Sequence, residues 1–97
     1  MNIGFLITRD AYADKIAAIA KAAIGRGHTV SIFMTDDGVR LLKDSSIAGL
    51  KDAGADVSLC DFSARNREIT EIPEGITAGT QYQNSLIHNE CDKVLIF

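Results

Sequence analysis

Short, nearly unbroken apolar runs alternate with segments of helical periodicity along this chain, and that alternation most limits the folds open to it. The apolar runs occupy residues 2–8, 29–34, 55–60 and 93–97. Strands with an apolar residue at almost every position are typical of a parallel sheet, because both faces of such a sheet are covered by helices. The alternation therefore predicts an α/β fold.

The segment 11–26 has the clearest helical pattern between these strands. Asp10 is placed to cap its start and Gly27 to end it, and its apolar residues recur at spacings of three and four: Ile16, Ile19, Ala20, Ala23 and Ile24. Weaker helical segments are predicted through 39–42 and at 47–53, 62–67 and 78–89. Together these elements predict a flavodoxin-like three-layer fold with a mainly parallel sheet of four to five strands, formed by residues 1–97 as a single domain.

The bulk composition excludes several classes of protein. A length of 97 residues with 46% hydrophobic side chains favours one domain with a modest core, for which association into a homo-oligomer is expected.

A net charge of −3, with acids and bases mixed along the chain, argues against nucleic-acid binding. No apolar run approaches the roughly 20 residues that cross a bilayer, and the start of the chain lacks the features of a signal peptide, so we expect no membrane insertion and a cytoplasmic location.

The carboxyl ends of the predicted strands are where chemistry is expected, because open parallel sheets bind ligands beyond those ends. Three short segments meet this description: Thr8-Arg9-Asp10, Thr35-Asp36-Asp37 and Cys60-Asp61-Phe62. The first lacks a glycine-rich phosphate loop. A small-anion or nucleotide site that includes Thr8 and Tyr12 nevertheless remains an alternative at this position.

Cys60 is the most informative residue of this edge. It ends a strand and precedes a predicted helical turn, so its sulfur is placed to meet free backbone N–H groups that favour a thiolate. Arg65 and Arg67 add positive charge nearby, whereas Asp61 opposes ionisation. The sequence is equally compatible with a small buried cysteine that closes the strand, since free cysteine is among the most buried residue types.

The other candidate ligands give weaker patterns. Cys91 lies between Glu90 and Asp92, which disfavour a thiolate and indicate a structural role. The two cysteines form no Cys-x-x-Cys pair, and neither His28 nor His88 has a partner at metal-ligand spacing. No metal and no organic cofactor is expected.

Three segments resemble the DsrE-type sulfur-relay family, particularly its TusD-like branch, over nearly the whole chain. Residues 7–12 (ITRDAY) resemble the turn after the first strand of that family, residues 60–67 (CDFSARNR) its Cys-x-x-(Ala/Ser)-Ala-x-x-Arg segment, and residues 91–97 (CDKVLIF) its closing Cys-Asp-Arg-Val-aliphatic segment. The resemblance implies a small α/β protein that forms trimers or hexamers and exchanges sulfur with donor and acceptor proteins. It also implies that Cys60 is the residue that accepts sulfane sulfur as a persulfide.

The resulting hypothesis is a sulfurtransferase subunit that carries sulfur on Cys60. Arg65 and Arg67 would stabilise the anionic persulfide or guide an acidic partner, and N–H groups around Phe62 and Ser63 would hold its charge. The alternative is a non-catalytic module of the same fold, acting as an oligomeric scaffold or binding a small anion or nucleotide.

Overall fold

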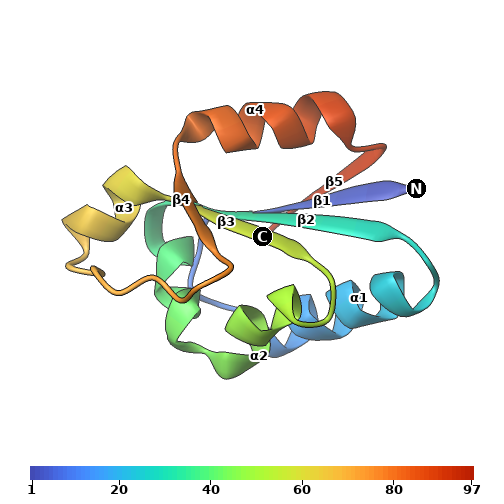
Figure 1. Ribbon diagram of the computed structural model, residues 1–97, viewed down its shortest axis with the longest axis horizontal. Helices are drawn as coiled ribbons and strands as arrows, with labels where there is room; N and C mark the ends of the chain where they lie inside the picture. The colour runs from blue at the N-terminus through green and yellow to red at the C-terminus, as the bar shows by residue number, and fades with distance from the viewer.

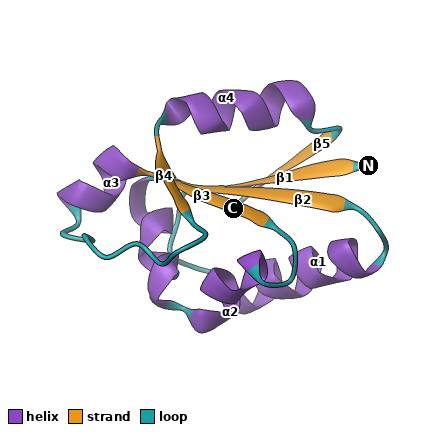
Figure 2. Ribbon diagram, in the orientation of Figure 1, coloured by secondary structure: helices purple, strands orange, loops and turns teal.

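The computed structural model describes residues 1–97 as a five-stranded, all-parallel sheet with helices on both faces (Figures 1 and 2). The strands are β1 (Asn2–Ile7), β2 (Thr29–Met34), β3 (Asp56–Cys60), β4 (Thr77–Gly79) and β5 (Lys93–Ile96). The α-helices are α1 (Ala13–Gly25), α2 (Ser45–Ala48), α3 (Asp61–Asn66) and α4 (Gln81–Glu90), and the 3₁₀ helices are η1 (Asp36–Lys43) and η2 (Gly49–Lys51). The predicted three-layer α/β class with a parallel sheet is confirmed.

The strand order is β4-β3-β2-β1-β5. The chain therefore adds four strands in one direction and reverses only for β5, which pairs with β1. Flavodoxin itself has the order 2-1-3-4-5, with its reversal between the first and third strands. The layers of the predicted class are thus present, while the order of strands inside the sheet differs from that of flavodoxin.

The predicted strands and helices agree with the observed ones except near the carboxyl-terminal helix. The pattern placed the start of that helix at Ala78, but residues 77–79 form β4, and α4 begins at Gln81. Three largely exposed residues with a glycine among them carry no apolar pattern, so β4 exists only because β3 offers it backbone partners. The predicted cap of α1 was also wrong, since Tyr12 and not Asp10 is its N-cap residue.

The two faces of the sheet carry unequal cores. The face covered by α1, α2 and the 3₁₀ helices holds a continuous cluster of 19 buried residues that includes Phe5, Ile32 and Leu59. The opposite face is covered by α4 (Figure 1) and holds only Leu6, Phe33, Cys60 and Ile87 as buried members of its cluster. Alternation along each strand assigns neighbouring residues to opposite faces, so Cys60 lies on the thinly covered α4 side.

One glycine fixes how closely η1 approaches the sheet. A Cβ atom added to Gly38 would overlap the backbone carbonyl of Ile7 at the end of β1. Only a residue without a side chain permits this approach. The segment that follows β2 is thereby pressed onto the carboxyl edge of the sheet, beside the start of α3.

Candidate functional site

Cys60 lies at the carboxyl end of β3, where the sheet meets the starts of α3 and α4. Its residue is only 5% exposed, because the side chain packs in the small cluster on the α4 face. It also lines an open cavity, together with residues from three stretches of the chain: Thr35, Asp36, Asp61, Phe62, Ser63, Arg65, Gly79, Thr80 and Gln81. Cys60 is therefore a buried residue that borders an opening at the carboxyl edge of the sheet.

The surroundings of Cys60 favour the ionised thiol. Burial acts to raise the pKa of Cys60, but hydrogen-bond donors from the Ser63 hydroxyl and backbone N–H, the Gln81 amide and the Phe62 N–H outweigh it and lower that pKa below its ordinary value. Cys60 is the N-cap residue of α3, and its side chain forms no cap hydrogen bond. The nearby donors act mainly on the thiolate, because an ionised sulfur accepts hydrogen bonds far better than a neutral thiol.

A chain of polar groups leads to the sulfur from the neighbouring segments. The amide Nε2 of Gln81 donates to Thr35 Oγ1 at 3.2 Å, and Thr35 Oγ1 lies 3.4 Å from Ser63 Oγ. The backbone N–H of Asp36 also donates to Ser63 Oγ, at 3.0 Å. Either hydroxyl of the Thr35–Ser63 pair can be the donor. When Thr35 donates in that pair, the single proton of the Ser63 hydroxyl is available to the Cys60 sulfur.

Cys91 has the opposite environment. Burial, followed by the negative charges of Asp92 and Glu90, raises the pKa of Cys91 above its ordinary value. Cys91 packs beside the cluster on the α4 face, and its sulfur lies close to Gly4 of β1. No disulfide joins it to Cys60, and both cysteines are free.

Four residues named from the sequence surround the cavity: Cys60, Phe62, Ser63 and Arg65. Phe62 is 72% exposed at the rim. Ser63 is buried against the thiol, and Arg65 forms an exposed ion pair with Asp61 at 2.8 Å, one turn back along α3. The sequence thus located the thiol and the α3 side of its cavity.

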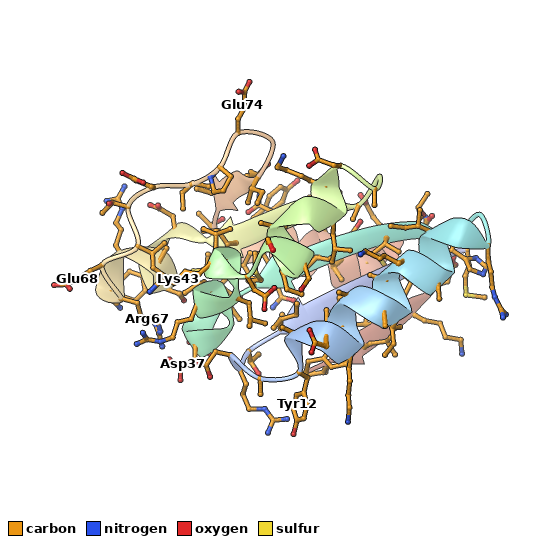
Figure 3. The ribbon with its side chains drawn as sticks, turned by 90° about the horizontal axis from the view of Figure 1, so that it is seen from below. Tyr12, Asp37, Lys43, Arg67, Glu68 and Glu74 are labelled. Carbon is orange, nitrogen blue, oxygen red and sulfur yellow. The ribbon has the colours of Figure 1, made fainter.

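Arg67, Thr8 and Tyr12 lie elsewhere. Arg67 is directed at Asp37 and lines a separate cavity with Lys43 and Glu68, and Figure 3 shows Tyr12 apart from this group. Thr8 donates through Oγ1 to the carbonyl of Phe97 at 3.0 Å. Tyr12 is an exposed residue with the cations of Arg9 and Lys15 each 5.6 Å from its ring centre. The structure does not bring these three residues to Cys60.

The sequence placed Thr35 and Asp36 at the expected edge of the sheet but gave them no role beside Cys60, and it did not identify Gln81. Thr35 follows β2, Asp36 begins η1, and Gln81 begins α4. One signal for Gln81 was present, since Thr80-Gln81-Tyr82-Gln83 has the spacing of a capping box and places Gln81 at a helix start. The box forms, with the Thr80 hydroxyl accepting from Tyr82 N and the Gln83 side chain accepting from Thr80 N.

The structure contains no group of three or more His, Cys, Asp or Glu side chains arranged to hold a metal ion. None of its helices combines the length and apolar character required to cross a bilayer.

Comparison with known proteins agrees with this architecture. The crystal structure of the ychN protein from Escherichia coli is similar over 100% of both chains, with a TM-score of 0.81 and 19% sequence identity, which shows a shared fold. No curated protein sequence matches the chain. The family model described as the DsrE/DsrF-like family matches residues 1–97 in full. This chain therefore belongs to the DsrE/DsrF-like family, which is generally associated with sulfur relay.

Proposed function

We propose that this protein is a sulfur-relay sulfurtransferase subunit that carries sulfane sulfur as a persulfide on Cys60. The observation that carries the proposal is the position of Cys60, which lines an open cavity among groups that lower the pKa of its thiol. Thiolate is the reactive form of cysteine, so such surroundings favour reaction at neutral pH. Membership of a family associated with sulfur relay supports the same conclusion.

The transfer consists of two thiol exchanges and needs no external oxidant or reductant. The Cys60 thiolate attacks the outer sulfur of a persulfide on a donor protein, a new S–S bond forms, and the donor cysteine leaves as a thiolate. Cys60 then bears the persulfide. A thiolate of the acceptor protein attacks the outer sulfur in turn, and Cys60 leaves as a thiolate, ready for another cycle.

The groups around the cavity are suited to hold the charge of the bound persulfide. The Ser63 hydroxyl and the N–H groups of Phe62 and Ser63, which favour the Cys60 thiolate, would stabilise the inner sulfur of the persulfide in the same way. Gln81 extends the set of donors from the opposite wall. Arg65 is exposed at the rim and is placed to meet an acidic face of a partner protein, while Phe62 offers that partner an apolar contact.

We further propose that the chain acts as a trimer or hexamer in the cytoplasm and exchanges sulfur with donor and acceptor proteins. The edge strand β5 supports self-association, because its outer backbone groups have no strand partner and Leu95 and Ile96 are exposed beside them. Native mass spectrometry measures the number of copies directly, and a purely monomeric protein at working concentration would contradict this part of the proposal.

The experiment that tests the function is a persulfide-loading assay. The protein is incubated with a small-molecule persulfide donor and its mass is measured before and after treatment with a reductant. We expect one added sulfur on Cys60 that the reductant removes, and no such adduct in Cys60→Ser. Cys91→Ser is the matched control and should load like the parent. Absence of an adduct from the parent protein would favour the scaffold or anion-binding alternative.

A further inference from the structure

The ion pair between Asp37 and Arg67 joins η1 to the segment of α3, which carries the Phe62 and Ser63 groups that act on Cys60. Arg67 follows α3, and its Nε donates to Asp37 Oδ1 in η1 at 2.9 Å (Figure 3). The same guanidinium donates through Nη1 to the backbone carbonyl of Ser63 at 3.2 Å. One side chain therefore ties η1 to Ser63, which lines the same cavity as Cys60 and lies three residues after it in the chain.

A second bond runs between the same two segments. The backbone N–H of Asp36, the residue before Asp37, donates to Ser63 Oγ at 3.0 Å. Asp36 has a φ of 49°, in the left-handed region that non-glycine residues rarely adopt. Such a conformation persists where the surrounding contacts hold it. Ser63 is thus held at its hydroxyl by Asp36 and at its carbonyl by Arg67.

We propose that Asp37 is a positioning residue for the Cys60 thiolate, acting through Arg67 to hold η1 against α3 so that the Ser63 hydroxyl stays directed at the sulfur. The proposal rests on the function proposed above, in which Cys60 reacts as a thiolate. Neither Asp37 nor Arg67 lines the cavity that contains Cys60. Their effect on the thiol is therefore indirect, and Arg67 takes a structural role in place of the persulfide contact expected from the sequence.

The burial of the two partners favours an effect on geometry over an effect on overall stability. The Asp37 side chain is 56% exposed, and exposed ion pairs contribute little to folding. The Arg67 side chain is only 21% exposed and forms two bonds at fixed angles, which suits a guanidinium that orients a neighbouring segment. The hydrogen bond from Arg67 also lowers the pKa of Asp37, so the pair is charged at neutral pH.

The substitution Asp37→Asn separates positioning from simple electrostatics, because the two predict opposite signs. Removing a negative charge near a thiol lowers its pKa by Coulomb interaction alone. Loss of positioning weakens a hydrogen bond to the thiolate and raises that pKa. We expect the second result, with alkylation of Cys60 at neutral pH slower by about three- to tenfold.

The measurement is the pH profile of Cys60 alkylation in a Cys91→Ser background. The charged groups that face the cavity are Asp36, Asp61 and Arg65, and all three stay unchanged in every variant. Asp37→Glu keeps a carboxylate for Arg67 and should restore much of the parent profile. Arg40→Gln is the matched control, because Arg40 also pairs with Asp37, at 3.5 Å, but has no bond to α3. Its profile should stay that of the parent.

The outcomes separate this inference from the proposed function. A parent profile with the ordinary pKa of a free thiol would overturn both. If the parent shows a lowered pKa for Cys60 and Asp37→Asn leaves that pKa unchanged or lowers it further, only the positioning role is overturned. Circular dichroism checks that each variant folds. If Asp37→Asn does not fold, Arg67→Lys decides, because lysine cannot form the two-armed contact. An unchanged profile in Arg67→Lys would then reject the proposal.

Discussion

At the scale of single residues, Cys60 and Cys91 show how neighbours decide the chemistry of a thiol. Both are partly covered by protein, and burial alone disfavours the thiolate at both positions. Cys60 differs because Ser63, Gln81 and the first N–H groups of α3 favour its thiolate and lower its pKa despite burial. Cys91 has acids on both sides and no compensating donors. Accessibility by itself would have favoured Cys91, since Cys60 is buried and Cys91 is only partly buried.

The first prediction follows from the opposite directions of these two pKa shifts. The alkylation of Cys60 should reach half its maximal rate at a lower pH than that of Cys91. Ser63→Ala should raise the pKa of Cys60 and slow its alkylation at neutral pH by about tenfold, since a hydrogen bond to a charged group is lost. Mass spectrometry of peptides from the alkylated protein reports each thiol separately. Identical profiles for the two cysteines would contradict the assignment.

The second prediction concerns Gln81, the donor that sequence reasoning did not find. Gln81→Glu places a carboxylate beside Cys60 in place of an amide donor, and a like charge raises the pKa of the thiol. We expect alkylation of Cys60 at neutral pH to slow by about tenfold or more. Gln83→Glu is the matched control, because it adds the same charge two residues further along α4, and glutamate also completes a capping box. Equal effects of both variants would indicate a general charge effect rather than a contact.

At the scale of elements, two short connections decide the geometry of the site. The capping box of Thr80 and Gln83 fixes where α4 begins, and so where Gln81 stands. The close approach at Gly38 presses η1 onto the sheet, and η1 supplies the N–H of Asp36 to Ser63. Neither connection contains the reactive residue, yet both determine which groups face it.

The third prediction tests the close approach of η1. Gly38→Ala should lower the free energy of unfolding by about 1–3 kcal/mol or more, because its Cβ overlaps a backbone carbonyl that cannot rotate away. Urea denaturation measures the change. Gly49→Ala is the control, since a Cβ there meets open space and the backbone has an ordinary helical conformation. That substitution should be neutral or stabilise by about 0.4–1 kcal/mol.

At the scale of the whole molecule, stability is expected to fall in acid. The side-chain and backbone hydrogen bonds from Ser46 lower the pKa of Asp44, and the bond from Arg67 lowers that of Asp37. A folded-state pKa below the unfolded value contributes stability that is complete above the unfolded value, 3.8, and is lost as the pH falls through the folded one.

The fourth prediction isolates Asp44, which caps α2. In urea denaturation, the parent should lose more stability between neutral pH and pH values below 3.8 than Asp44→Ala does. The variant lacks the group whose protonation causes that part of the loss. An identical acid dependence in both proteins would show that other groups determine it.

The sequence by itself determined the α/β class, the positions of four strands and the place of Cys60 at a strand end before a helical turn. These features are local, because apolar periodicity and the residues next to a strand end are sufficient to specify them. It also gave the opposite tendencies of the two cysteines, since the acids beside Cys91 are adjacent in the chain.

Only the tertiary structure decided the strand order, the existence of β4 and which side chains reach the sulfur. Gln81 and Thr35 are 46 positions apart, and Asp36 and Ser63 are 27 apart, so their contacts depend on which strands are neighbours. The direction of Arg67 was settled in the same way, by Asp37 on another segment 30 positions away. Periodicity reports the face on which a residue lies, but the partner on that face is set by the packing of distant segments.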